Sequence, residues 1–203
     1  MSVEAEGAIV VLESERPSVV IRQADRPGDL GWVVMAHGEQ YAAEFGWNTE
    51  FEALVARIVA DFAADHDPTR ERAWVVELDG HRVGCVFCVR KDNETAQLRI
   101  LLVTSDGRGH GLGHRLVAEC IDFARAAGYR RLVLWTNDPL AAARHLYLAA
   151  GFTLIDEAPH HSFGIDLIGQ NYELDLVGDG CATRCQPGDP EVRTSDDQAP
   201  GTQ

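Results

Sequence analysis

Four glycines at every second position, in the stretch TSDGRGHGLGHRL from Thr104 to Leu116, constrain the fold more than any other feature. They lie between an apolar run, LRILLV, and an amphipathic run, LVAECIDFARAAG, which indicates a strand followed by a helix. Glycine is unfavourable in such a place unless the backbone adopts unusual dihedral angles or approaches a ligand closely. The stretch therefore predicts a strand, a main-chain binding loop and a helix in succession.

The chain length and composition predict one folded domain. With 203 residues, 45% of them hydrophobic, the chain can bury a sizeable core. We expect a loose arm over 1–17, the folded domain over 18–177 and a disordered tail over 178–203, which has almost no large apolar residues. No run approaches the ~18 apolar residues of a membrane helix, and the first residues lack the positive leader of a secretory signal. We therefore expect a cytoplasmic protein without a membrane partner.

The charge and the cysteines exclude several kinds of site. A formal net charge of −14, with no Lys/Arg run, argues against a nucleic-acid partner because phosphates would be repelled. The odd number of cysteines, five, argues against a disulfide framework. Cys85 and Cys88 fall in a predicted strand, where positions i and i+3 point to opposite faces, and Cys181 and Cys185 fall in the tail. The sequence therefore predicts no metal site.

Apolar runs and turn signals predict seven strands and four helices. The strands cover 18–25, 73–80, 81–90, 97–103, 131–136, 152–155 and 171–177, with a hairpin turn at Asp79-Gly80 and a loop over 156–164. The helices cover 29–46 with an interruption at Gly38, 49–62 behind a Thr49/Glu52 capping box, 112–128, and 140–150 behind a cap at Asn137. The order β-α-α-β-β-β-α-β-α-β-β predicts the α/β (α+β) class, with a mixed sheet flanked by helices.

The pattern of the glycine stretch discriminates between phosphate-binding loops. A P-loop is excluded because no Lys-Ser or Lys-Thr pair follows the glycines. The dinucleotide fingerprint Gly-x-Gly-x-x-Gly fails because its sixth position is His114 or Leu112. The pattern Arg/Gln-x-x-Gly-x-Gly/Ala fits Arg108 to Gly113 at every position. Amides at a helix start, with the helix dipole, favour a diphosphate there, and a glycine-rich turn without a ligand is the alternative.

With a second motif, the chain resembles the GNAT acetyltransferase superfamily. That motif is Asn137 after the next strand, followed by Leu146-Tyr147-x-x-x-Gly151-Phe152. The runs RILLV, LWTN, ARHLY and HHSFG also resemble the acetyltransferase domain that is fused behind MarR-type regulators. The resemblance implies a GNAT-like, mixed and mostly antiparallel sheet, acetyl-CoA as co-substrate and no metal. Regulation of transcription is not carried over.

The resemblance also implies roles for individual residues. Tyr147 matches the family tyrosine that protonates the departing thiolate. The cofactor-binding residues, with the main chain serving in the first three, are Leu101, Leu102, Val103, Arg108, Gly109, His110, Gly111, Leu112, Gly113, His114 and Asn137. Asn137 has an alternative role as the cap of the following helix.

The acceptor site is less well defined by the sequence. We expect the pocket to be formed by His37, Tyr41, Glu44, Trp47, Glu50 and His161. The strand before the glycine loop carries no carboxylate, so the general base is either water or one of His37, Glu44, Glu50 and His161. The acidity of the chain favours a cationic small molecule, such as a polyamine, over a protein lysine or N-terminus.

Taken together, the sequence predicts an N-acetyltransferase that moves an acetyl group from acetyl-CoA to a primary amine on a small molecule. A non-catalytic acyl-CoA-binding sensor or partner module is an alternative, which the missing carboxylate favours and Tyr147 disfavours. A nucleotide-binding enzyme is a second alternative, weakened by the failed fingerprints. A homodimer is compatible with the resemblance, because many relatives pair through sheet edges.

Overall fold

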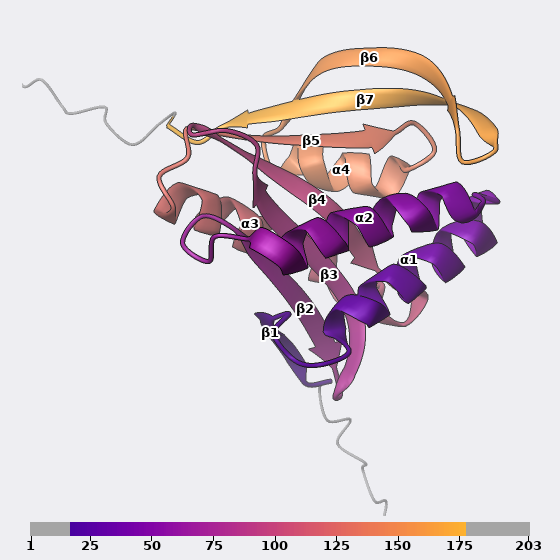
Figure 1. The fold of residues 1–203 in the computed structure, drawn as a ribbon, viewed down its shortest axis with the longest axis horizontal. Helices are drawn as coiled ribbons and strands as arrows, with labels where there is room; N and C mark the ends of the chain where they lie inside the picture. The colour runs from indigo at the N-terminus through magenta and orange to yellow at the C-terminus, as the bar shows by residue number, and fades with distance from the viewer. Residues whose placement is uncertain (1–16, 178–203) are drawn as a thin grey trace, which may run out of the picture.

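A seven-stranded mixed sheet organises residues 17–177, the part of the chain that the computed structural model describes (Figure 1). The strand order is β1-β2-β3-β4-β5-β7-β6. The strands are β1 (Val19–Gln23), β2 (Arg72–Leu78), β3 (His81–Arg90), β4 (Thr95–Val103), β5 (Arg131–Asn137), β6 (Thr153–Ser162) and β7 (Ile165–Asp175). The helices are α1 (Asp29–Phe45), α2 (Thr49–Asp65), the 3-10 turn η1 (Ser105–Gly107), α3 (Leu112–Ala126) and α4 (Ala141–Ala149).

Every neighbouring pair of strands is antiparallel except β4 and β5, which are parallel. This confirms the predicted fold class and element order. The β2–β3 hairpin turns at Asp79 and Gly80, whose φ angles of 50° and 82° are those of a tight turn. The arm predicted over 1–17, apart from Pro17, and the tail over 178–203, including Cys181 and Cys185, lie outside the described residues.

Two helical layers cover the sheet, α1 and α2 on one face and α3 and α4 on the other (Figure 1). Alternate residues of the central strands enter the two cores, as the period of a strand requires. Cys85 is buried under α1 and α2, whereas Cys88 is buried against α3. The predicted opposite placement of these two cysteines is confirmed.

Two local predictions on the first helical layer are wrong. Gly38 does not interrupt α1, because it lies inside the helix where α2 passes closely: a Cβ there would come within 3.1 Å of the Glu52 side chain. The cap of α2 is Asn48 rather than Thr49, since the Asn48 side chain accepts the Glu50 amide at 2.9 Å. Asparagine is as good a cap as threonine, and the sequence offers both in succession.

The predicted loop over 156–164 is also wrong, because β6 continues to Ser162 and turns into β7 at Phe163 and Gly164. β6 is an edge strand whose side chains are mostly exposed, so it lacks the alternating apolar pattern of a half-buried strand. Its Pro159 is tolerated at an edge. Asn137 is likewise not a helix cap but the last residue of β5, and α4 begins at Ala141 without a side-chain cap.

The tip of the β6–β7 hairpin is fastened to the start of α2. Phe163 packs against Trp47 and Phe51, with ring centroids 4.8 and 5.2 Å apart. Its backbone amide donates to Glu50 Oε2 at 3.0 Å, and the Asn48 amide donates to its carbonyl at 3.1 Å. The hairpin, which extends the sheet beyond β5, is therefore fixed at its tip to the first helical layer (Figure 1).

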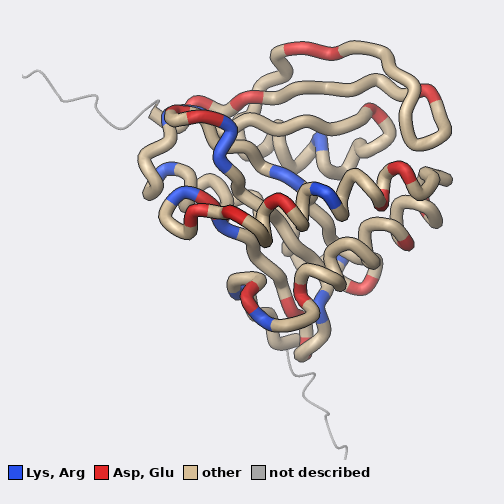
Figure 2. The backbone as a smooth tube through the Cα atoms, viewed as in Figure 1, with Lys and Arg blue, Asp and Glu red and all other residues tan. Residues whose placement is uncertain are grey.

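Charges of both signs are distributed over the fold, and no element of the described part gathers a basic stripe (Figure 2). Within residues 17–177, no helix has both the length and the apolar character needed to cross a membrane.

One carboxylate, Asp29 at the start of α1, is buried and ties β1 and β3 to that helix. Its side chain is 1% exposed and accepts from Arg22 at 2.6 and 2.9 Å, from Arg82 at 3.2 Å and from the Arg26 amide at 3.0 Å. The Arg22 guanidinium holds the pKa of this carboxyl below its usual range. Removing Asp29 would leave Arg22 as a partly buried cation with Glu77 as its remaining partner.

We expect Asp29→Asn to lower the free energy of unfolding by about 3 kcal/mol in urea titrations at pH 7, because it breaks a buried ion pair. The contribution of the Asp29 carboxylate to the free energy of unfolding is complete above its pKa in the unfolded chain, ~3.9. It is lost as the pH falls through its lower pKa in the folded protein. The variant should therefore lose less stability than the wild type between pH ~4 and pH ~2. Asp25→Asn, at an exposed neighbour, is the control and should change stability by less than ~0.5 kcal/mol.

Candidate active site

The two parallel strands at the middle of the sheet separate before they end. β4 and β5 pair only from Thr95 with Arg131 to Leu98 with Leu134. Beyond that point, residues 99–103 of β4 and 135–137 of β5 have no pairing with each other. Backbone groups that would complete a ladder are thus available to a ligand in the gap.

A β-bulge in β4 marks the point of separation. Arg99 is opposite Phe87, whereas Leu102 is opposite Cys85, so β4 contains one extra residue between these pairs. Ile100 in the bulge has a φ of 44°, a left-handed conformation that is strained for a β-branched residue. Its carbonyl accepts the Cys85 thiol at 3.4 Å. The bulge bends β4 away from β5 and redirects its backbone toward the gap.

The glycine stretch forms the turn from β4 into α3, as predicted. Gly109 and Gly111 have φ angles of 81° and 69°, which only glycine adopts without strain. Gly111 is the N-cap of α3, and no side chain caps this helix end. The first amides of α3 are therefore available to an anion, and the helix dipole adds positive potential there.

A cavity of about 480 Å³ lies against this turn. Nine of the eleven predicted cofactor-binding residues line it, from the end of β4 to the start of α3: Leu101, Leu102, Val103, Arg108, Gly109, Gly111, Leu112, Gly113 and His114. His110 is exposed in the same turn without lining the cavity, and Asn137 lines the neighbouring cavity. Arg108 donates to Glu44 of α1 at 2.5 Å, which ties the turn to the first helical layer.

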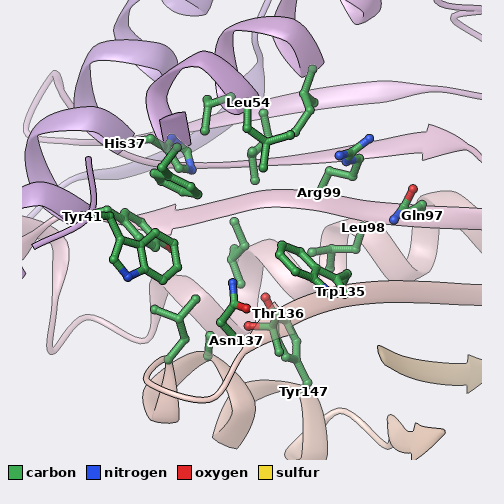
Figure 3. A pocket seen from close by; sticks show the side chains of 18 residues that line it. His37, Tyr41, Leu54, Gln97, Leu98, Arg99, Trp135, Thr136, Asn137 and Tyr147 are labelled. Atoms are coloured by element: carbon green, nitrogen blue, oxygen red, sulfur yellow. The ribbon is translucent and has the colours of Figure 1, made fainter. Parts of the chain in front are cut away.

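A second, smaller cavity of about 100 Å³ lies between α1, α2 and the separated strands (Figure 3). The two cavities share four lining residues, which therefore mark their junction: Tyr41, Leu101, Leu140 and Ala143. A molecule in the larger cavity can meet a molecule in the smaller one only at this junction. The arrangement is suited to a reaction between two substrates bound side by side.

Tyr147 projects from α4 to the smaller cavity beside Thr136 and Asn137 (Figure 3). It is 5% exposed, and its ring packs against Phe152 and Tyr172. Burial, with the neighbouring Tyr41 phenol as a second cause, raises the pKa of Tyr147 well above its ordinary value. The phenol therefore keeps its proton at neutral pH.

Asn137 is positioned by the β6–β7 hairpin. Its Oδ1 accepts from His160 Nε2 at 2.8 Å, and His160 Nδ1 lies 2.9 Å from the Ser162 hydroxyl. An amide oxygen only accepts, so Nε2 of His160 carries the hydrogen and the Asn137 amide nitrogen is directed to the cavity (Figure 3). A Cβ on Gly169 would lie 3.2 Å from the His160 ring, so this contact depends on glycine.

The structure brings together only part of the predicted acceptor pocket. His37, Tyr41 and Trp47 line the smaller cavity, whereas Glu44 lines the larger one and pairs with Arg108. Glu50 is engaged by the Phe163 amide and lines neither cavity. His161 lies on the exposed hairpin, 2.7 Å from Asp166. Contacts between distant segments decide these positions, such as that of Glu44 with Arg108 and that of Glu50 with the Phe163 amide, and no local pattern indicates them.

Sequence reasoning missed the strand residues that line the smaller cavity, above all Gln97, Arg99, Trp135 and Thr136. One signal was present for Arg99: it is the single charged residue in the apolar run LRILLV. His160 was also missed as a partner of Asn137, although it lies in the HHSFG run.

His37 is the one predicted base candidate that lines the smaller cavity. Its Nδ1 donates to the Val33 carbonyl at 2.8 Å, and its buried Nε2 has no partner among the described residues. Burial lowers the pKa of His37 to about 4, so the ring is neutral and a weak base at physiological pH.

The nearest thiol to α4 is unsuited to nucleophilic chemistry. Cys120 is fully buried, and burial together with the neighbouring Cys88 raises its pKa. Among residues 17–177, no group of three or more His, Cys, Asp or Glu side chains is placed to hold a metal ion.

Comparison with known proteins gives a consistent result. The model of the family described as "Acetyltransferase (GNAT) family" matches residues 32–152. N-acetylaspartate synthetase of Danio rerio is 35% identical over 96 residues, 47% of this chain and 34% of that protein. Mycothiol acetyltransferase of Beutenbergia cavernae is 33% identical over 94 residues, 45% of this chain and 31% of that protein. The chain thus spans about a third of the length of these two relatives.

Among solved structures, yncA from Salmonella typhimurium with its cofactor acetyl-CoA superposes with a TM-score of 0.65 at 23% identity. The match covers 82% of this chain and 99% of that one. It shows that the two chains share a fold.

We expect the His37 ring to stay neutral, with its proton on Nδ1, from pH 8 down to pH 5 in NMR titrations. Because its folded pKa of about 4 lies below the unfolded value of ~6.5, the unfolded chain binds a proton more readily in this range. Stability should therefore fall as the pH drops from ~6.5 toward ~4, and less so in His37→Leu. A ring that titrates near pH ~6.5 would contradict the assignment.

Proposed function

Because the chain belongs to the acetyltransferase (GNAT) family, we propose that it transfers an acetyl group from acetyl-CoA to the nitrogen of a primary amine on a small molecule. The observation that carries the proposal is the junction of the two cavities at Leu101, with Tyr147 and Asn137 beside it. The larger cavity would hold the coenzyme and the smaller one the amine. The small volume of the second cavity, about 100 Å³, favours a small acceptor.

The coenzyme would be held mainly by main-chain groups. Its diphosphate would bind the free amides at the start of α3, where Gly109 and Gly111 let it approach the backbone. The pantetheine arm would pair with the unpaired edge of β4 along Leu101–Val103 and bring the thioester to the junction. The solved fold neighbour from Salmonella typhimurium, whose cofactor is acetyl-CoA, supports this choice of ligand.

The proposed chemistry is direct transfer between two bound substrates. The amine nitrogen attacks the thioester carbonyl carbon, the carbon–sulfur bond breaks, and an amide forms. Tyr147 donates its phenolic proton to the departing sulfur, and its raised pKa ensures that this proton is present at neutral pH. The inert thiol of Cys120 gives no support to a route through a covalent acyl-enzyme.

The acceptor must lose a proton before or during attack, because an ammonium has no lone pair. No carboxylate lines the smaller cavity among the described residues, and His37 is a weak base. We therefore propose that water removes this proton. The lack of a carboxylate in the smaller cavity among the described residues also favours the second candidate function, a non-catalytic acyl-CoA sensor.

Thiol release from acetyl-CoA with a panel of amines separates the two candidates. Release with at least one amine supports the acetyltransferase. Coenzyme binding in calorimetry without release for any acceptor supports the sensor. The likeness to the MarR-fused domains, the homodimer and the cytoplasmic location stay predictions.

We expect Tyr147→Phe to lower kcat at least ~10-fold, because the leaving sulfur loses its proton donor. The affinity for acetyl-CoA should change little, since Tyr147 does not line the larger cavity. Steady-state kinetics and calorimetry measure the two effects. Tyr129→Phe is the control, because it removes a phenol that bonds the Arg70 carbonyl away from both cavities. Unchanged turnover in the Tyr147 variant would refute its role.

We expect Gly111→Ala to weaken coenzyme binding at least ~10-fold in calorimetry, because the methyl strains a left-handed position where the diphosphate meets the backbone. Gly128→Ala is the matched control: Gly128 has a φ of 81°, free space around its Cβ position and a place beyond the far end of α3. Both variants should lose ~1 kcal/mol of stability. Equal coenzyme affinity in the two would contradict the proposed diphosphate site.

A further inference from the structure

The smaller cavity carries one formal charge among its lining side chains, and that charge is positive. Among residues 17–177, Arg99 is the only Lys, Arg, Asp or Glu that lines it. The ring of His37 is neutral, and the other lining side chains are apolar or uncharged. A cation in an apolar cavity is a specific recognition element, because its field is weakly screened there.

Arg99 has no partner in the described part of the chain. No hydrogen bond to its guanidinium and no carboxylate within 4.0 Å of it is found over residues 17–177, although Asp61 of α2 acts on it from a longer distance. It is partly buried on β4, and burial lowers its pKa. Its guanidinium nitrogens are not among the buried polar atoms without a partner, so they are open to solvent or to a ligand. Its planar fork of donors matches a carboxylate in two parallel hydrogen bonds.

Building on the proposed function, we infer that the acceptor is an amine that also carries a single carboxylate, and that Arg99 binds this carboxylate while the amine faces the thioester at Leu101. The substrate class is thus a monocarboxylic amino acid. Arg99 would act as a specificity-determining residue rather than as a catalytic one.

The geometry of β4 fits such a molecule. Arg99 precedes Leu101 by two residues, and at ~3.3 Å per residue their Cα atoms are at most ~7 Å apart. Arg99 and Trp135 lie at one end of the cavity and Tyr41, at the junction, lies at the other (Figure 3). A molecule whose amine lies at the junction can therefore direct its carboxylate toward Arg99, most directly when several bonds separate the two groups, as in 4-aminobutyrate.

The rest of the lining indicates an apolar side chain on the acceptor. Leu54 and Ile58 of α2 and Trp135 of β5 line the same cavity as Arg99, and no further Lys or Arg of the described residues lines it. A dicarboxylate such as aspartate would leave its second charge without a partner, which is costly in an apolar site. A polyamine would place a second ammonium beside Arg99 with no carboxylate in the lining to bind it.

The net charge of the chain, −14, by itself favours a cationic acceptor. The local charge decides against it, because exposed charges are screened beyond ~10 Å whereas a partly buried charge in the cavity is screened much less. The net charge of the surface affects how fast a charged ligand approaches, whereas the charge inside the cavity determines which ligand binds.

Matched substrate pairs test the inference. L-leucine is compared with 3-methylbutylamine, L-phenylalanine with 2-phenylethylamine, and 4-aminobutyrate with butylamine; each pair differs by one carboxylate. L-aspartate and spermidine are added as a dicarboxylate and a polyamine. We expect kcat/KM to favour the carboxylate member of at least one pair ~10-fold or more, and to exceed the values for aspartate and spermidine.

Variants assign that preference to Arg99. Arg99→Gln should reduce the ratio of kcat/KM within the preferred pair at least ~10-fold, mainly through KM, and leave acetyl-CoA affinity unchanged. Arg99→Lys, which keeps the charge but loses the fork, should give an intermediate ratio. Arg57→Gln is the control: Arg57 is exposed on α2 next to Ile58, carries the same charge and lines neither cavity. It should leave the ratio unchanged.

The outcomes separate this inference from the proposed function. Acetylation without preference for a carboxylate, or a preference that survives in Arg99→Gln, overturns the inference and leaves the acetyltransferase intact. If no acceptor is acetylated, the proposed function fails. In that case, calorimetry on the coenzyme-loaded protein tests the role of Arg99 separately. We expect the carboxylate member of a pair to bind more tightly than the plain amine in the wild type and not in Arg99→Gln. Any other result overturns the inference.

Discussion

The separation of β4 from β5 is the constraint on which the rest of the site depends. Two parallel strands that stayed paired to their ends would use every backbone group in the ladder. Here the ladder stops at Leu98 and Leu134, and the bulge at Ile100 holds the two strand ends apart. The strained φ of Ile100 is maintained by the pairing of β4 with the buried strand β3 before and after the bulge and by the contact with Cys85. The sheet thus gives up a few hydrogen bonds and gains a gap in which two substrates can meet.

The β6–β7 hairpin acts on this gap through one residue of its lining, Asn137. Its tip is fixed to the start of α2 by Phe163 and Glu50, and its inner face orients Asn137 through His160. The hairpin is exposed over most of β6, so apolar burial alone does not hold it in place. Aromatic packing at the tip and hydrogen bonds at the side do so instead. The lining of the smaller cavity itself comes from α1, α2, β4, β5 and α4, so residues as distant in the chain as His37 and Tyr147 share one small space.

Charged residues have different roles on the surface and in the two cavities of this molecule. The surface is acidic overall, and the residues of both signs are interspersed (Figure 2). The two cavities contain few charges, and each has a distinct place: Arg108 is paired with Glu44 at the glycine turn, whereas Arg99 has no partner in the described chain. A paired cation ties elements together, and an unpaired one is available to a ligand. The proposed selection of a monocarboxylic amine follows from this difference.

The sequence alone determined the class of fold, the order of its elements and the position of the glycine turn, because these follow from local periods and from the φ angles that glycine allows. It also indicated nine of the twenty residues that line the larger cavity, because these nine lie close together in the chain, at the end of one strand and the start of one helix. The tertiary structure decided most of the smaller cavity, for which the sequence indicated His37, Tyr41 and Trp47 as pocket residues. The extent of β6, the docking of its hairpin, the role of Asn137 and the exposure of Arg99 to the cavity all depend on contacts between distant segments. Such contacts leave no pattern in a short stretch of sequence. An edge strand needs no alternation of apolar residues, so its extent cannot be read from its residues. A charged residue within an apolar run, such as Arg99, looks the same in the sequence whether or not it has a partner in the fold.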